Sequence, residues 1–312
     1  MNKLRLISLG TMYVDINCIN FPFTKALSVQ RETTGNEYQL ELGGSALNFA
    51  RLTAQLGLHT TFIGKIGKDM MGKILLELLK KNTIYSSVIE DGNVQTNLAA
   101  HYIYRDGTSV MTSSGSANQA LTYHEVQERL AHHEGAALLY IGGCFKLKKL
   151  LPYLPALAKM AQKKGIRVIL DHGRITNQVS KEDIQIIREL ITHTDIYLPS
   201  IDEFLMVWES QTIAGGIISM KDYGQPCTVI KQGDFGAVGF YKNNRIEISA
   251  VPISVINTVG AGDSFNAGFI KAYSEGKDMK ECIRYACATA VVKAPTLELP
   301  TNASRGKLLE RR

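Results

Sequence analysis

The feature that most constrains the fold is an alternation of short apolar runs with helical patterns in the second half of the chain. Each apolar run, about five residues long, follows a segment whose apolar residues recur at helical spacing. Runs of this kind are typical of parallel strands that are buried on both faces. The sequence therefore predicts an α/β fold with helices on both faces of a parallel sheet. The predicted strands of this part are 137–141, 166–170, 196–198 and 227–231.

The first part of the chain contains similar elements in a less regular order. Leu4–Leu9 and Thr60–Ile63 are predicted strands. A helix is predicted from Ser45, a favourable N-cap residue, up to Gly57. A glycine-containing loop at 64–69 then leads into a second helix.

Two segments do not fit a sheet covered by helices. Residues 12–40 are irregular, and residues 94–112 predict a β-hairpin because Asp-Gly within Arg105-Asp106-Gly107 is a strong turn signal. We expect these segments to form a small β-sheet inserted in a single domain, residues 1–312. Such a sheet could close over a substrate as a lid, and its exposed strand edges could pair two subunits into a homodimer.

Composition excludes several classes of partner. The net charge is +6, and no run of Lys and Arg is interleaved with aromatic residues, so nucleic acid is not an expected ligand. No apolar run reaches membrane-spanning length, and the N-terminus lacks the apolar core of a signal peptide. The five cysteines are scattered without a C-x-x-C pair. Free thiols in the reducing cytoplasm are therefore expected.

The stretch from Asn257 to Gly268 carries the strongest chemical signal. Gly260, Ala261 and Gly262 lack bulk and run directly into Asp263 at the start of a predicted helix. Their N–H groups would form an anion site together with the helix N-terminus. A carboxylate beside a bound phosphate could accept the proton of an attacking hydroxyl. The alternative is a plain glycine turn whose Asp is favoured by the helix dipole.

Other nucleotide-binding motifs are absent from the sequence. A dinucleotide-binding enzyme requires G-x-G-x-x-G after its first strand, and the region of Gly10 has no such pattern. Gly260-x-Gly262 is followed by Phe265 where the third glycine is needed. No G-x-x-x-x-G-K-[ST] occurs, which excludes a P-loop enzyme.

Two signatures together resemble the ribokinase-like (PfkB) family of carbohydrate and nucleoside kinases. The first is Gly43-Gly44-Ser45-Ala46-Leu47-Asn48-Phe49-Ala50, continued by Gly64-Lys65-Ile66-Gly67-Lys68-Asp69. The second is the stretch from Asn257 to Asp263, which is similar to the family's D-T-x-G-A-G-D. The resemblance covers nearly the whole chain and implies the ribokinase-like fold with a small β-sheet lid.

The resemblance implies a mechanism and an acceptor site. In the family the final aspartate of the second signature, here Asp263, removes the proton from the acceptor hydroxyl. The backbone of Gly260, Ala261 and Gly262 would hold the charge of the transferred phosphoryl group. The positions that match the family's sugar-binding residues are Asp15, Gly43, Gly44 and Asn48.

The resemblance also implies sites for ATP and Mg²⁺. Glu203 matches the glutamate of an N-x-x-E motif that orders water around Mg²⁺, and Ser200 replaces the Asn of that motif. Gly233 and Gly236 match the loop on which the nucleotide lies, and Lys231 could reach a phosphate. A solvated glutamate, ordinary turn glycines and a solvated lysine are the alternatives at these positions.

Two departures from the family pattern bear on cation and substrate. Asn257 stands where some relatives have an Asp that helps to bind a monovalent cation, so we expect little dependence on such a cation. Ser45 stands where kinases of sugar phosphates more often have Lys, which favours an unphosphorylated acceptor. The prediction is ATP-dependent phosphorylation of a hydroxyl group of a small sugar. The alternatives are a nucleoside kinase and a kinase-fold binding protein with reduced turnover.

Overall fold

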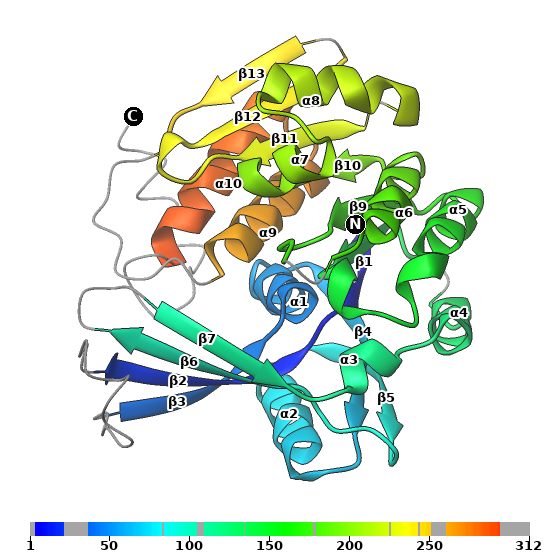
Figure 1. The fold of residues 1–312 in the computed structure, drawn as a ribbon, viewed down its shortest axis with the longest axis vertical. Helices are drawn as coiled ribbons and strands as arrows, with labels where there is room; N and C mark the ends of the chain where they lie inside the picture. Colours follow the sequence, from blue (N-terminus) through cyan, green and yellow to red (C-terminus); the bar gives the residue numbers. More distant parts are fainter. Residues whose placement is uncertain are drawn as a thin grey trace.

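A nine-stranded sheet forms the centre of the molecule, in the order β13-β12-β11-β10-β9-β8-β1-β4-β5 (Figure 1). The computed structural model describes residues 4–21, 37–82, 84–104, 109–133, 135–176, 179–224, 226–242, 244–250 and 260–293. The strands from β5 to β11 are parallel, and β12 and β13 form an antiparallel edge. The strands are β1 Arg5–Gly10, β4 His59–Gly67, β5 Tyr85–Asp91, β8 Leu138–Gly142, β9 Arg167–Asp171, β10 Ile196–Tyr197, β11 Cys227–Lys231, β12 Ala237–Tyr241 and β13 Asn244–Ile248.

Helices cover both faces of this sheet, which confirms the predicted α/β fold. Successive residues of a strand point to opposite faces, so Leu6 packs into one helix layer and Ile7 into the other. Each fully buried side chain of this kind stabilises the fold by about 1.5–3 kcal/mol. No helix in the described ranges is both long and apolar enough to cross a membrane. One layer contains α1 Ser45–Gln55, α2 Met70–Lys81, α9 Ala261–Ser274 and α10 Met279–Lys293; the other contains α4 Tyr123–Ala131, α5 Leu154–Lys163, α6 Lys181–Ile191, α7 Ile201–Val207 and α8 Ile213–Met220.

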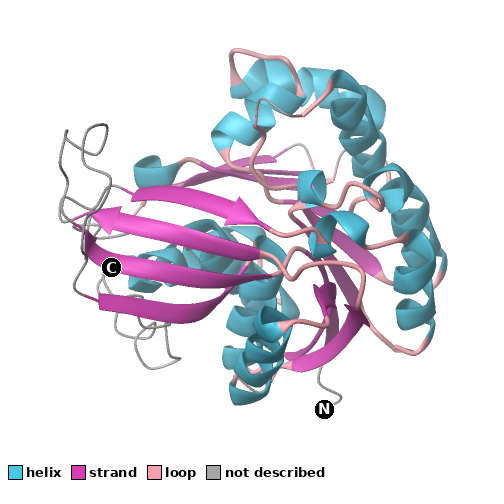
Figure 2. Cartoon of the chain, turned by 60° about the horizontal axis from the view of Figure 1, so that its bottom comes forward, coloured by secondary structure: helices cyan, strands magenta, loops and turns pink. Residues whose placement is uncertain are grey.

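A second sheet of four strands, in the order β3-β2-β6-β7, extends from one side of the main sheet (Figure 2). β2 pairs with β3 and β6 pairs with β7 in antiparallel fashion, while β2 and β6 are parallel. The predicted segments 12–40 and 94–112 thus supply a small β-sheet. Residues 22–36 and the predicted turn 105–107 lie outside the described residues. The bounds are β2 Tyr13–Phe21, β3 Glu37–Gly43, β6 Leu98–Tyr104 and β7 Ser109–Ser114.

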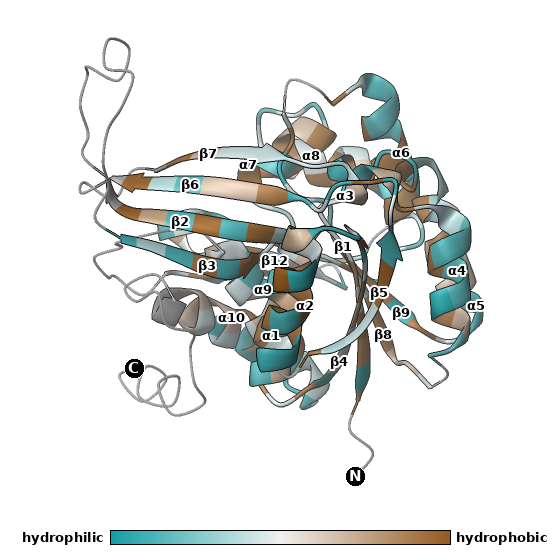
Figure 3. Cartoon of the chain, turned by 90° about the horizontal axis from the view of Figure 1, so that it is seen from below, coloured by the Kyte–Doolittle hydropathy of each residue, from teal (hydrophilic) through white to brown (hydrophobic). Residues whose placement is uncertain are grey.

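The two faces of the small sheet differ in polarity. Val14 and Leu42 are paired neighbours on one face and are buried in the core of the main domain. Asp15, Asn17 and His101 are buried polar residues on the opposite face. Figure 3 shows apolar and polar residues along β2 and β6. One face therefore attaches the sheet to the core, and the other offers hydrogen-bonding groups.

The side chain of Asn118 joins the small sheet to the main one. Its Oδ1 accepts from the Met12 N–H at 3.1 Å, and its Nδ2 donates to the Met12 carbonyl at 3.1 Å. The Asn118 N–H in turn donates to Oδ1 of Asn97, directly before β6, at 2.8 Å. Ala117 and Asn118 are the first two residues of the short helix α3, Ala117–Ala120. These bonds fix the entrances to β2 and β6 relative to each other.

The structure differs from the sequence analysis at three places in the first half of the chain. Residues 64–67 continue strand β4 instead of forming a loop, because their glycines serve close packing: a Cβ on Gly67 would lie 2.3 Å from the Val94 carbonyl. The edge strand β5 was not predicted. Ser45 is the first residue of α1, and Gly44, with φ of 93°, is the N-cap.

Candidate active site

The start of α9 holds the predicted anion-binding turn. Gly260 is the N-cap in the left-handed conformation, with φ of 73°, which residues with a Cβ rarely adopt. Ala261 and Gly262 form the start of the helix, and Asp263 lies in its first turn. The first N–H groups of a helix have no partner within it, so this turn can present donors and a positive dipole end to an anion.

The carboxylate of Asp263 is held by helix α1. Ser45 Oγ donates to Asp263 Oδ1 at 3.1 Å, and Asn48 Nδ2 donates to Oδ2 at 3.1 Å. Ser45 and Asn48 are three residues apart on one helix, so their side chains point to the same side. The structure therefore brings the predicted base into direct contact with one predicted acceptor residue, Asn48.

Asp15 and the glycine pair of the first signature also lie together. Gly43 leaves space for the Asp15 carboxylate, since a Cβ at this glycine would lie 1.9 Å from Oδ1. A Cβ on Gly44 would lie 2.5 Å from the Thr11 carbonyl. His101 Nε2 lies 3.4 Å from Asp15 Oδ2. These glycines thus let β2 and the start of α1 approach each other around a carboxylate.

Arg51, which was not predicted, lies within the electrostatic reach of both carboxylates. Its Nη2 donates to Asn48 Oδ1 at 3.2 Å, and the residue is only 6% exposed. Burial lowers the pKa of the guanidinium, and the carboxylates of Glu41, Asp263 and Asp15 oppose that shift. Arg51 follows Asn48 by three residues, the spacing of neighbours on one helix face, and this is the signal that could have identified it.

Lys231 lies on the other side of the α9 turn. Its Nζ is 2.8 Å from Asp171 Oδ2 and donates to Asn266 Oδ1 at 3.3 Å. A Cβ placed on Gly262 would lie 3.6 Å from the same Nζ. Burial acts to lower the pKa of Lys231, but the carboxylates of Asp171 and Glu203 outweigh it and raise the pKa. A charged ammonium therefore lies close to the anion-binding turn.

Ser200 and Glu203 form a capping box at the start of α7. Glu203 Oε2 accepts from the Ser200 N–H at 2.8 Å, and Ser200 Oγ accepts from the Glu203 N–H at 3.5 Å. The box uses one carboxylate oxygen of Glu203, so the group can still face a hydrated Mg²⁺ ion. No group of three or more His, Cys, Asp or Glu residues within the described ranges is arranged to hold a metal ion directly.

Gly233 and Gly236 lie in the turn between β11 and β12. Their φ angles are 57° and 94°, so both need the left-handed region. A Cβ on Gly236 would lie 2.0 Å from the Ile248 carbonyl, whereas Gly233 faces open space. The ring of Phe235 between them is 83% exposed. The turn thus offers accessible backbone at Gly233 and an exposed apolar ring at Phe235. It follows directly after β11, which ends at Lys231.

Three further residues of this region were missed. Asp171 ends β9, and no role was predicted for it. Asn266 lies three residues after Asp263 on α9, and Tyr140 is a tyrosine within the apolar strand β8. Asn266 Nδ2 donates to both the Tyr140 hydroxyl, at 3.2 Å, and Asp171 Oδ2.

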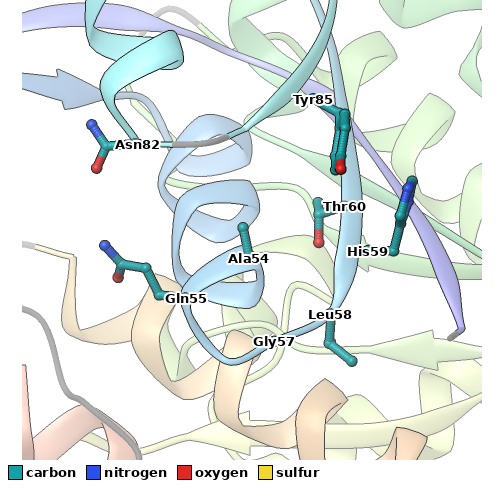
Figure 4. A pocket seen from close by; sticks show the side chains of 8 residues that line it. All are labelled: Ala54, Gln55, Gly57, Leu58, His59, Thr60, Asn82 and Tyr85. Atoms are coloured by element: carbon teal, nitrogen blue, oxygen red, sulfur yellow. The ribbon is translucent and has the colours of Figure 1, made fainter.

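A separate pocket lies at the far end of α1 and contains no candidate site residue (Figure 4). Its volume is about 230 Å³, and it lies between the end of α1, the start of β4 and the residues around α2 and β5. The rings of His59 and Tyr85 are stacked there, with centroids 4.6 Å apart. The helix α1 thus separates this pocket from Asp263, which contacts its first residue.

Comparisons with known proteins identify the family. The model of the pfkB family carbohydrate kinases matches residues 5–297. The chain is 28% identical over 284 residues to a ribokinase of Arabidopsis thaliana, covering 86% of this chain and 72% of that protein. It is 25% identical over 304 residues to a 5-dehydro-2-deoxygluconokinase of Clostridium botulinum, covering 93% of this chain and 87% of that protein.

A solved structure shows the same fold. Arabidopsis thaliana ribokinase complexed with ribose and ATP superimposes with a TM-score of 0.77 at 24% identity, covering 99% of each chain. The family match extends over nearly all of the chain and includes both sequence signatures. This chain therefore belongs to the pfkB family of carbohydrate kinases and is a phosphotransferase that acts on an alcohol group.

Proposed function

We propose that this protein transfers the terminal phosphoryl group of ATP to a hydroxyl group of a small, neutral sugar. The observation that carries the proposal is the position of the Asp263 carboxylate, in the first turn of α9 beside the Gly260–Gly262 turn. The carboxylate would accept the proton of the attacking hydroxyl. The N–H groups of the turn would stabilise the negative charge of the phosphoryl group.

Lys231 would add a fixed positive charge to this site. Its ammonium lies beside Gly262, and its pairing with Asp171 favours the charged form. Charge spreads over the phosphoryl oxygens in the transition state, so a nearby ammonium lowers the barrier by electrostatic attraction. Binding of the nucleotide on the Gly233–Gly236 turn would place its phosphates between Lys231 and the start of α9.

ATP and Mg²⁺ fit the residues at this edge of the sheet. The Arabidopsis thaliana ribokinase structure contains ATP, which supports a nucleotide site in this fold. Glu203 would hold Mg²⁺ through water, because Mg²⁺ keeps much of its hydration shell. The ion would neutralise phosphate charge when bound. The capping box fixes the Glu203 carboxylate at the start of α7 for this role.

The acceptor side supports an uncharged substrate. Asp15, Glu41 and Asp263 place three carboxylates around Arg51. Among the described residues on this side, Arg51 is buried and donates to Asn48, and His101 lies against Asp15. Such a lining offers acceptors and amide groups for sugar hydroxyls and repels a phosphate or carboxylate on the acceptor. It supports the expectation drawn from Ser45.

An acceptor screen tests the proposed function. We would measure ATP-dependent phosphorylation and thermal shifts with ribose, fructose, fructose 6-phosphate, 5-dehydro-2-deoxygluconate and adenosine. We expect turnover with a neutral sugar and a higher unfolding temperature in its presence, because a ligand stabilises the state that binds it. Turnover with adenosine alone would identify a nucleoside kinase. Ligand binding without turnover would identify a binding protein.

We further propose that the small sheet closes over the acceptor. Its polar face carries Asp15, Asn17 and His101, so closure would place these groups on the sugar and exclude water. Hydrogen exchange of β2 and β6 should slow when the acceptor binds. Exchange that ignores the acceptor would contradict a lid. Light scattering tests the predicted homodimer through the strand edges of this sheet.

A further inference from the structure

Three polar side chains meet where the ends of β9 and β11 lie against α9. Lys231 Nζ lies 2.8 Å from Asp171 Oδ2 and donates to Asn266 Oδ1 at 3.3 Å. Asn266 Nδ2 donates to the same oxygen of Asp171. Each of the three residues therefore contacts the other two. We call Asp171, Lys231 and Asn266 the polar triangle.

The partners of Asn266 fix the orientation of its amide. The ammonium of Lys231 can only donate, so it must face the amide oxygen. The carboxylate of Asp171 can only accept, so it must face the amide nitrogen. The same nitrogen donates to the Tyr140 hydroxyl at 3.2 Å. An ionised aspartate would have the same size as Asn266 but no proton to donate. The position therefore uses both ends of an uncharged amide.

Packing alone does not explain an amide at this position. Asn266 is fully buried, and its neighbours in α9, Phe265 and Ala267, are apolar and buried. A buried amide is costly unless its hydrogen bonds are made. With Asp171 as its acceptor alone, the ammonium of Lys231 could swing on its long, flexible stem. A second acceptor on another element fixes the direction in which the ammonium lies.

The helix that carries Asn266 also carries the predicted anion-binding turn. Asn266 follows Gly262 by four residues in α9, which is about one helical turn. A Cβ placed on Gly262 would lie 3.6 Å from Lys231 Nζ. The start of α9 thus offers N–H groups to a phosphoryl group, and its next turn holds the nearby cation. The distance between the cation and the anion-binding turn is set within one helix.

We infer that Asn266 is a positioning residue that holds the Lys231 ammonium beside Gly262, at the place where the phosphoryl group would bind. This inference rests on the proposed function, because the Gly260–Gly262 turn must bind that group. Charges that are already in place when the reaction occurs stabilise a transition state most effectively. Asn266 would therefore affect the chemical step through Lys231 without touching the substrate.

The variant Asn266→Ala tests the inference. We expect kcat to fall about 10-fold, since a hydrogen bond to a charged group is lost. The KM for the acceptor should not change, because the Asp263 side of α9 is untouched. The matched control is Thr289→Val. Thr289 is also fully buried and packs against α9 at Gly268, but its hydroxyl donates to the Tyr285 carbonyl, outside the polar triangle. Equal losses of kcat in both variants would overturn the inference.

A second test asks whether Asn266 acts through Lys231. The background is the double variant Asp171→Asn/Lys231→Met, which removes both charges and leaves no buried charge without a partner. Adding Asn266→Ala to this background should lower kcat less than about two-fold, because the ammonium that Asn266 positions is gone. A further fall of about 10-fold in this background would contradict a role through Lys231.

Nitrogen NMR of the lysine side chains separates failure of the inference from failure of the proposed function. If the unmodified protein phosphorylates no acceptor in the screen, the proposed function is wrong. The ammonium signal of Lys231 still decides whether Asn266 holds this group. The signal is assigned by its absence from Asp171→Asn/Lys231→Met. It should shift in Asn266→Ala and stay in place in Thr289→Val. An unshifted signal in Asn266→Ala would overturn the inference.

Discussion

Asp263 and Glu203 occupy the same place in two helices and are used in opposite ways. Each is an acidic residue in the first turn, of α9 and α7 respectively. Glu203 turns back on its own helix and accepts from the N–H of Ser200. Asp263 instead reaches across to α1, where Ser45 and Asn48 hold its two oxygens.

The difference lies in the residue that begins each helix. Ser200 has a side chain that accepts from the helix, and it forms a reciprocal box with Glu203. Gly260 has no side chain and adopts a left-handed conformation. The start of α9 is therefore open to a ligand, and its acid is held by another element. An acidic residue in a first turn can act on a substrate where the cap leaves the helix terminus accessible.

The variant Asp263→Asn tests the first acid of this comparison, which we propose as the general base. We expect kcat to fall by about 10² to 10⁴-fold, the usual scale for removal of a general base. Nucleotide affinity should change little, since the N–H groups of the turn remain. Steady-state kinetics with the best acceptor and a separate ATP binding measurement check this. Unchanged kcat would show that Asp263 is not the base.

Both acids act on Lys231: burial lowers the pKa of its ammonium, but the carboxylate of Asp171 and then those of Glu203 and Asp263 raise it. Lys231→Met leaves the buried carboxylate of Asp171 without its main partner. We therefore expect the unfolding free energy to fall by about 3–5 kcal/mol. The double variant Asp171→Asn/Lys231→Met should recover much of it. The control is Lys148→Met, which breaks an exposed pair with Asp183 at a cost below about 1 kcal/mol. Equal effects of the two single variants would contradict the prediction.

The same pair predicts a pH dependence of stability. Burial acts to raise the pKa of Asp171, but Lys231 outweighs it and holds the pKa below the usual value, while the pKa of Lys231 is raised. The contribution of the pair is thus complete between about pH 4 and pH 10. It is lost as the pH falls through the native pKa of Asp171 or rises through that of Lys231. Denaturant unfolding at several pH values checks this. Below about pH 4 and above about pH 10, the unfolding free energy should change less with pH in Asp171→Asn/Lys231→Met than in the unmodified protein.

Glu203 permits a separation of its capping and metal roles. Gln can also close a capping box, so Glu203→Gln should keep the unfolding free energy but raise the Mg²⁺ concentration for half-maximal rate a few-fold. Glu203→Ala should in addition lose about 1 kcal/mol of stability. Magnesium titrations and unfolding curves distinguish the two effects. An unchanged Mg²⁺ requirement in both variants would leave Glu203 with the capping role alone.

The smallest expected effect concerns monovalent cations. Asn257, which lies outside the described residues, offers a neutral carbonyl where relatives with Asp offer a full charge. We expect the rate to differ less than about two-fold between potassium and tetramethylammonium at equal ionic strength, because the attraction for a cation is weak. Asn257→Asp should increase the response. A large activation of the unmodified protein by potassium would contradict this prediction.

The main elements were predictable because they have strong local signals. The buried strands of the parallel sheet are continuous apolar runs, and α9 follows directly from its glycines and Asp263. Strand β5 was missed because it has the sequence YSSVIED, and a half-exposed edge strand needs no apolar run. Residues 64–67 look like a loop in sequence, since glycine that serves close packing is indistinguishable there from glycine that serves a turn.

Within the site, contacts between residues that are far apart in the sequence could not be predicted. The type of residue and its spacing pointed to Asp263 and Asn48, but nothing local relates Ser45 to Asp263. Their contact depends on the packing of α1 against α9, which only the complete fold determines. Tyr140 reads as one more large residue of a buried strand. Its hydroxyl gains significance only when Asn266, from the distant helix α9, donates a hydrogen bond to it.

The parallel pairing of β2 with β6 has a consequence for synthesis of the protein. Asp15 pairs with Ala99, so most of the first half of the chain separates the two central strands of the small sheet. While the ribosome makes this intervening part, the edge of β2 that later binds β6 has no partner. Unpaired edges associate readily with other chains. The nascent chain is therefore most exposed to aggregation between the emergence of β2 and that of β6.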